Sequence, residues 1–121
     1  MEEFTNYEYL IGKKVTRVEE KKNCIIFYTD NEKIYIDKFI PYCCCNVGEY
    51  IDNIKFSNKK VNGIITAIKE NINKINNCSE VVYRGEVTFF FENSKINMKV
   101  HGEDNGYYGV SFTMPVYIEK I

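Results

Sequence analysis

The chemistry that this sequence could perform centres on a run of cysteines, Tyr42-Cys43-Cys44-Cys45. Cys43 and Cys45 have one residue between them and could face the same side, with Cys78 and His101, the only histidine, as further ligands for a metal. Zinc sites favour paired ligands two to four residues apart, and this spacing does not match them. We therefore expect small buried thiols in a loop, with no metal and no other cofactor.

A nucleophilic cysteine is the second chemical possibility, because His101 could act as its base with Glu103 or Asp104 beside it. Almost any chain that contains Cys and His would pass this test, so we assign no catalytic residue. The cysteine count of five is odd, which argues against a disulfide framework. A Cys/His metal-binding protein and a Cys-dependent enzyme stay open as alternative interpretations.

Two acidic residues follow the cysteines at a spacing of three. Glu49 and Asp52 would share one face of a helical turn, which we expect around residues 48–54. With Cys44 they could form a polar pocket or a weak cation site. A solvated turn is the plainer interpretation.

The elements that position these residues follow from an internal repeat. Thr16, in residues 11–19, corresponds to Thr66, in residues 61–70. Each copy then runs through an apolar segment and an acidic turn, Asp30-Asn31 or Glu92-Asn93, into an alternating segment. Alternation with a period of two is typical of half-buried strands, so each copy predicts a three-stranded antiparallel meander.

The fold class that follows is mainly β: two such meanders in one sheet or a small sandwich or barrel, with one or two short helices. We expect a single domain over residues 1–121, with repeat halves of approximately 10–40 and 60–114. A helical turn is expected near residues 4–10.

One segment is ambiguous, because isoleucines at 64, 68, 72 and 75 also fit an amphipathic helix. The match to the first copy favours a strand over residues 64–70 and a loop over the Asn-rich residues 71–79. A last hairpin at Asn105-Gly106 is expected to lead into a strand over 107–114, which Pro115 ends.

Composition excludes several function classes. The 16 basic and 17 acidic residues give a net charge of -1, which argues against sequence-independent nucleic-acid binding and against a DNA mimic. No apolar run approaches the ~20 residues of a membrane span. The first residues lack the features of a signal peptide, so we expect a cytoplasmic protein that is not associated with membranes.

Aromatic residues make up 15% of the chain and suggest an interaction surface. The run Phe89-Phe90-Phe91 predicts a strand that is covered on both faces, and Tyr107 and Tyr108 should point to opposite faces of theirs. Arginine occurs only twice, at positions 17 and 84. Exposed tyrosine and arginine are frequent at binding hot spots. The candidate interface residues are Tyr42, Glu49, Tyr50, Arg84, Asn105, Tyr107 and Tyr108.

Three motifs together resemble a small uncharacterised domain family seen mainly in phages and prophages. They are the strand opening Leu10-Ile11-Gly12-Lys13, the Cys44-Cys45 pair followed by Glu49, and the hairpin Asn105-Gly106-Tyr107-Tyr108. The likeness covers about residues 9–113. The family pattern has Asp-Cys-Cys-Glu, whereas here Tyr42 or Cys43 stands in place of the Asp and the Glu is delayed to position 49.

The resemblance implies a phage or prophage accessory protein and supplies no catalytic residues. We expect a non-enzymatic protein, monomeric or homodimeric, that acts in the host cytoplasm. It would bind and inhibit a host protein, such as an antiviral defence factor of the CRISPR nuclease type. The alternative is an oligomer that sequesters a small signalling nucleotide.

Overall fold

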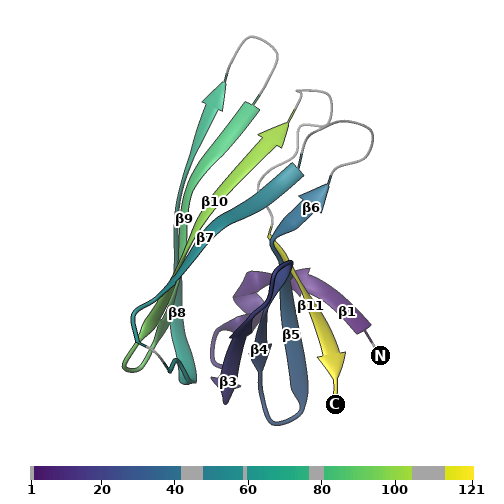
Figure 1. Ribbon diagram of the computed structural model, residues 1–121, viewed down its shortest axis with the longest axis vertical. Coiled ribbons are helices and arrows are strands. Elements are labelled where there is room, and N and C mark those ends of the chain that lie inside the picture. Colours follow the sequence, from purple (N-terminus) through teal and green to yellow (C-terminus); the bar gives the residue numbers. More distant parts are fainter. Residues whose placement is uncertain (1, 42–47, 59, 77–80, 105–113) are drawn as a thin grey trace.

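Two antiparallel sheets make up the protein in the computed structural model, which describes residues 2–41, 48–58, 60–76, 81–104 and 114–121 (Figure 1). The five-stranded sheet has the order β1 (Glu2–Asn6), β11 (Pro115–Lys120), β5 (Glu32–Asp37), β4 (Cys24–Tyr28) and β3 (Arg17–Glu20). The six-stranded sheet has the order β2 (Lys14–Val15), β8 (Gly63–Asn76), β9 (Val81–Phe91), β10 (Lys95–Asp104), β7 (Gly48–Phe56) and β6 (Phe39–Pro41).

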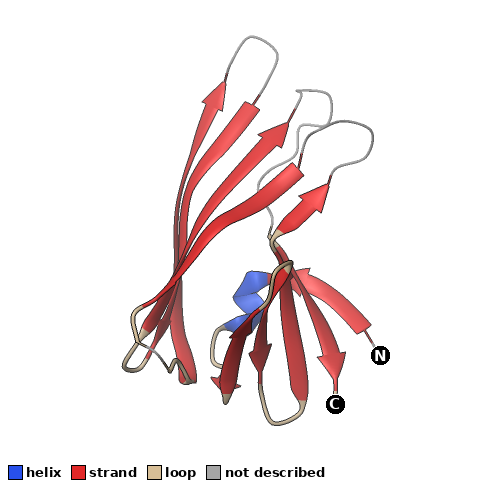
Figure 2. Cartoon of the chain, in the orientation of Figure 1, coloured by secondary structure: helices blue, strands red, loops and turns tan. Residues whose placement is uncertain are grey.

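The expected mainly β fold is confirmed, and the two sheets face each other around one core. A single 3-10 turn, η1 (Tyr7–Leu10), lies between the sheets (Figure 2). It is the only helix among the described residues and is far too short to cross a membrane. Alternate residues of the strands fill the core, as a period of two requires. The largest fully buried hydrophobic side chains are Phe27, Phe89, Leu10, Ile25, Ile34, Ile36, Ile65, Ile96, Met98, Met114 and Ile118.

The internal repeat is present in the hydrogen bonds as well as in the sequence. β3-β4-β5 and β8-β9-β10 are both antiparallel meanders. In the first, the Thr16 hydroxyl donates to the Tyr28 carbonyl over 3.2 Å. In the second, the Thr66 hydroxyl donates to the Phe90 carbonyl, also over 3.2 Å. Each threonine lies where the strand register is interrupted, so both meanders begin with the same irregularity.

The turns of the two meanders are also equivalent. The Thr29 amide donates to the Glu32 carbonyl over 2.9 Å, and the Phe91 amide donates to the Ser94 carbonyl over 2.8 Å. Both turns hold the acidic residue and the asparagine that the sequence placed there.

Each meander gains its fourth strand from the other half of the chain. β7 follows the first meander but pairs with β10, while β11 follows the second and pairs with β5. The registers correspond: Ile36 lies opposite Val116, and Met98 lies opposite Ile54. The two halves are therefore crossed over one another, and neither sheet is built from one half alone.

Two single residues carry the chain from one sheet to the other. At Lys38, between β5 and β6, the amide donates to Asn23 over 2.9 Å, while the carbonyl accepts from the Ile51 amide over 2.7 Å. One residue thus serves both sheets through the peptide groups on its two sides. At Thr16, between β2 and β3, the chain makes the corresponding change at the other corner.

Three expectations about individual segments are wrong. Residues 48–54 lie in strand β7 and form no helical turn. Asn71–Asn76 of the expected Asn-rich loop continue β8, because β9 supplies partners as far as Asn76. Pro115 begins β11 instead of ending a strand, and its missing amide costs nothing at that first position. The expected hairpin at Asn105-Gly106 and the strand residues 107–113 lie outside the described residues.

A buried carboxylate links three elements at one end of the sandwich. Glu32, only 2% exposed, accepts hydrogen bonds from the Tyr9 hydroxyl at 2.6 Å and from the ammonium groups of Lys13 and Lys120 at 3.2 Å each. Burial raises the pKa of Glu32, but these three donors together outweigh burial and leave the pKa below its ordinary value of 4.5. The cluster joins η1, the beginning of β5 and the end of β11.

Candidate binding face

The outer face of the six-stranded sheet carries one row of side chains that crosses five strands. Phe39 on β6 lies opposite Tyr50 on β7, which lies opposite His101 on β10. His101 lies opposite Arg84 on β9, and Arg84 lies opposite Asn73 on β8. Directly opposite residues point to the same face of a sheet. We call these five residues the outer row.

The aromatic members of the outer row are stacked. The rings of Phe39 and Tyr50 are 4.8 Å apart between centroids at an interplanar angle of 29°. Those of Tyr50 and His101 are 5.0 Å apart at 16°. Phe39 is 48% exposed, and Arg84 is also exposed. Stacking restricts the side-chain rotamers, so a partner that binds here would have less conformational entropy to remove.

Two carboxylates lie beside the nitrogens of the His101 ring, and one of them, Glu103, is within hydrogen-bond distance. The ring Nδ1 lies 3.7 Å from Asp52 Oδ2, and the ring Nε2 lies 3.1 Å from Glu103 Oε1. Both ring nitrogens therefore face acidic groups on opposite sides of the ring. Within the described ranges, no three His, Cys, Asp or Glu side chains are placed to hold a metal ion. The carboxylates orient the imidazole in the outer row.

A shallow hollow of about 340 Å³ lies beside His101 on this face. Arg84 and Lys99 contribute positive charge to its wall, and Asp52 contributes negative charge. The hollow thus offers guanidinium and ammonium nitrogens within one patch, whereas the imidazole nitrogens of His101 already face Asp52 and Glu103. The guanidinium and ammonium groups are donors for acidic or hydrogen-bond-accepting groups.

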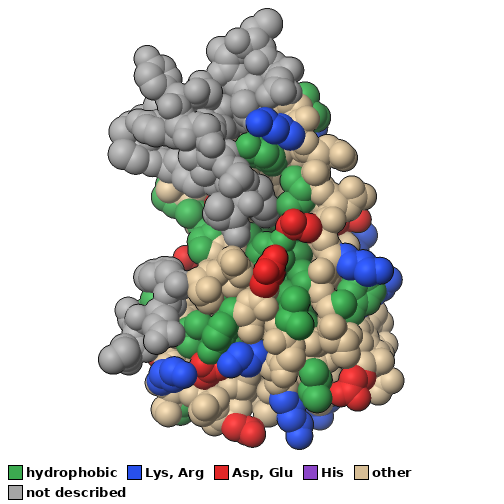
Figure 3. Space-filling view, turned by 180° about the vertical axis from the view of Figure 1, so that it is seen from behind, with side chains coloured by type: hydrophobic (Ala, Val, Ile, Leu, Met, Phe, Trp, Pro, Cys, Tyr) green, Lys and Arg blue, Asp and Glu red, His purple; other side chains and the backbone are tan. Residues whose placement is uncertain are grey.

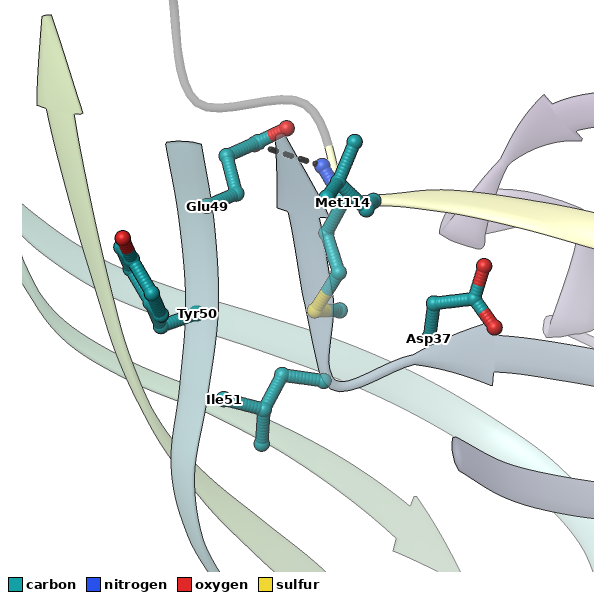
Figure 4. Close-up of a pocket in the computed structure, with 6 residues that line it drawn as sticks. Asp37, Glu49, Tyr50, Ile51 and Met114 are labelled. Carbon is teal, nitrogen blue, oxygen red and sulfur yellow. Dashed lines mark hydrogen bonds between the residues drawn. The ribbon is translucent and has the colours of Figure 1, made fainter. Parts of the chain in front are cut away.

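Glu49, expected at an interface, is buried on the opposite side of β7 from Tyr50 (Figure 4). Its Oε1 accepts a hydrogen bond from the Met114 amide at 2.9 Å. The gap that Glu49, Ile51 and Met114 line has no room for a water molecule. The carboxylate therefore links β7 to the beginning of β11. It does not share a face with Asp52, because residues 48–54 are extended.

Four of the five cysteines lie outside the described residues, namely Cys43, Cys44, Cys45 and Cys78. Tyr42, which was expected at an interface, also lies outside them. Cys24 is described and is partly buried in β4. Burial raises the pKa of the Cys24 thiol, and the charge of Asp37 adds to that effect. A raised pKa disfavours the thiolate, so Cys24 lacks the usual property of a nucleophile.

The structure brings together two of the residues that the sequence singled out for an interface. Tyr50 and Arg84 flank His101 in the outer row, although 33 residues of chain lie between them. In the sequence, His101 is a candidate metal ligand or base, and Phe39 carries no signal that marks it out. The aromatic identities were visible, but their stacking depends on the strand register. Asn105, Tyr107 and Tyr108 lie outside the described residues.

Charged side chains on the described part of one face of the molecule are mixed in sign (Figure 3). In the face shown in Figure 3, acidic and basic groups are interspersed among hydrophobic ones. This distribution agrees with the net charge of -1 and shows no large area of one charge on the described part of that face. It gives no support to a nucleic-acid-binding surface there.

The fold and the outer row define a small all-β domain whose outer sheet face carries stacked aromatic rings and charged groups of both signs. The chain belongs to the family described as Domain of unknown function (DUF7448), whose model matches residues 8–114. The match covers both meanders and the crossed strand β7, and it ends where β11 begins. No curated protein and no solved structure shows a significant match to the chain.

Proposed function

We propose that this protein is a non-enzymatic binding protein that attaches to a host protein through the outer row and inhibits it. The observation that carries the proposal is the stack of Phe39, Tyr50 and His101, beside which the exposed Arg84 lies opposite His101 on the next strand. Aromatic residues and arginine are the types enriched at protein interfaces, and they dominate binding energy when a partner covers them.

A second part of the proposal concerns the biological setting in which the protein acts. The sequence resembles a domain family of phages and prophages, and we propose that this protein is a phage-type accessory protein. Its target class would be an antiviral defence factor, such as a CRISPR nuclease, in the host cytoplasm. A target of this kind is consistent with a small binding domain that offers a fixed face of mixed charge.

The test is a plating assay on host cells that carry a defined defence nuclease. Expression of the wild-type protein is expected to raise the plating efficiency of a targeted phage, and Tyr50→Ala and Arg84→Ala are expected to abolish that gain. Matched controls come from the other sheet: Tyr35→Ala, from an outer aromatic pair with Tyr117, and Lys21→Ala, at the exposed β3–β4 turn. These controls should keep the wild-type gain.

The direct readout is cross-linking to the nuclease itself. A photoreactive phenylalanine at position 84 is expected to form a covalent adduct with the target, whereas the same residue at position 21 is not. The proposal fails if the adduct forms equally at both positions, or if the controls and the outer-row variants inhibit alike.

Sequestration of a small signalling nucleotide is the second candidate, and the hollow beside His101 favours it. Arg84 and Lys99 supply two positively charged side chains around about 340 Å³. Equilibrium dialysis against cyclic dinucleotides tests it. Retention that is lost in Lys99→Ala but kept in Tyr50→Ala would favour nucleotide binding over protein binding, because Tyr50 is outside the hollow lining.

A further inference from the structure

In the part of the chain that the structure describes, strand β8 has a long open edge. Gly63 and Ile64 pair with β2, and Ile65 exchanges hydrogen bonds with Gly12 and Lys13 at 2.8 and 3.1 Å. From Thr66 to Asn76, no strand in the described part of the chain pairs with that side of β8. An unpaired edge of this length offers amide and carbonyl groups to another strand.

The position of Asn71 shows which backbone groups are available at that edge. Its carbonyl oxygen approaches Gly85 so closely that a side chain at position 85 would collide with it, so this carbonyl points toward β9. Backbone groups alternate in direction along a strand. The amides and carbonyls of Glu70, Ile72 and Lys74 therefore point away from β9, toward the open edge.

The side chains of the same three residues make this edge complementary to itself. They lie on the inner face of the sheet, where Ile72 packs against the core. If two copies of β8 pair antiparallel about a two-fold axis at Ile72, Glu70 lies opposite Lys74 of the partner subunit. Symmetry produces this pair of opposite charges twice. On the other face, Asn71 lies opposite Asn73 of the partner subunit.

The carboxylate of Glu70 is already held by this chain. Its Oε2 accepts a hydrogen bond from the Tyr7 hydroxyl. The group is thus positioned beside the edge before a partner arrives. Lysines at an open edge commonly keep other strands away. Here the two-fold axis places Lys74 opposite the acidic Glu70 of the partner subunit. The positive charge of Lys74 would therefore favour pairing with a second copy of this chain.

We propose that the protein forms a homodimer by antiparallel pairing of β8 with β8 of a second copy, with the axis at Ile72. The two six-stranded sheets then become one continuous sheet. The proposal goes beyond the proposed function, because the ion pairs lie on the inner face of β8, whereas Tyr50 and Arg84, which test target binding, lie on the outer face of other strands. Oligomeric state and target binding are measured separately, so one can fail without the other.

The experiment is native mass spectrometry and light scattering of the full chain in low salt. Wild-type protein should have twice the 14.3 kDa of one chain. Glu70→Lys and Lys74→Glu each place two like-charged pairs at the axis and should weaken dimerisation at least about tenfold. Lys69→Glu is the matched control, because Lys69 would lie opposite Ile75 of the partner subunit. It should leave the dimer intact.

Mixing the two charge-reversed variants separates mispairing from misfolding. An equimolar mixture of Glu70→Lys and Lys74→Glu should recover a heterodimer, because each lysine again faces a glutamate. In addition, Ile72→Cys should form a disulfide across the axis above the level seen in wild type, and Ile75→Cys should not. A monomeric wild type, a dimer that Lys74→Glu leaves unchanged, or a mixture that stays monomeric would each overturn the proposal.

Discussion

Phe27 and Phe89 occupy equivalent positions in the two halves of the chain, and they pack against each other. Their ring centroids are 5.5 Å apart with an interplanar angle of 69°, an edge-to-face contact. Both side chains are fully buried, and each lies on the middle strand of its meander. The pseudo-symmetric halves therefore meet at matching residues in the centre of the core.

The first prediction concerns this central contact. Phe27→Ala and Phe89→Ala should each lower the free energy of unfolding by about 3–5 kcal/mol, because each leaves a large cavity. The losses should not add in the double variant, since the two rings touch. Urea unfolding measures all three. Phe39→Ala, at a 48% exposed position, is the control and should cost less than about 1 kcal/mol. Losses below about 1 kcal/mol at both core positions would contradict the described packing.

The second prediction tests the repeat through its two threonines. Thr16→Val and Thr66→Val each remove one hydrogen bond from a hydroxyl to a strand carbonyl. Each should cost about 0.5–1 kcal/mol of unfolding free energy, with the two losses alike. Thr5→Val, at an exposed position of β1, should change stability by less than about 0.5 kcal/mol. A loss at one threonine only would show that the two bonds are not equivalent.

The third prediction concerns pH and Glu32. The pKa of Glu32 is lowered in the folded protein, so its contribution to stability is present above pH 4.5 and is lost as pH falls through the lower, folded value. Glu32→Gln should lower the free energy of unfolding by about 2 kcal/mol at pH 7. The free energy of unfolding of this variant should also fall less steeply than that of the wild type as the pH is lowered. Urea midpoints between pH 7 and pH 3 measure both effects.

Glu20→Gln is the control for this pH experiment. Glu20 pairs with Lys38 at 2.7 Å but is exposed, so its removal should cost less than about 1 kcal/mol. If Glu20→Gln and Glu32→Gln change the acid profile equally, the buried cluster has no special role in acid stability.

The fourth prediction distinguishes two kinds of glycine. Gly85→Ala should destabilise the protein by about 1–3 kcal/mol, because the new methyl group collides with the backbone of Asn71 and Ile72 on β8. Gly12→Ala meets no atom within 4 Å but must adopt a φ of +85°, which costs about 1 kcal/mol. Hydrogen exchange should show faster opening of β8 and β9 in Gly85→Ala only. Equal exchange in the two variants would contradict the close approach of these strands.

The sequence contained enough information to predict the two meanders and their turns, because side-chain alternation and turn residues are local signals. It could not predict the length of β8. Ile64, Ile68, Ile72 and Ile75 fit a helical spacing, yet Ile68 and Ile72 face the core while Ile64 and Ile75 are exposed. The register interruption at Thr66 changes which residues face inward, and a periodicity analysis does not detect such an interruption.

The outer row depends on information that the sequence lacks. Tyr50 and Arg84 were chosen as residue types suited to interfaces, but their shared row requires the registers of β7, β10 and β9. The crossed pairing of β7 and β11 was missed for a related reason. Alternation shows that a strand has a buried face but does not identify its neighbours.

The crossing of β7 and β11 affects the order in which the protein can fold during synthesis. When β5 leaves the ribosome, one of its neighbours is β4, but the other, β11, follows almost 80 residues later. In the first meander, β5 therefore lacks its second neighbouring strand until the second meander and β11 have been translated. Contacts between residues so distant in the chain slow folding, so the nascent first half depends on the late arrival of a short strand.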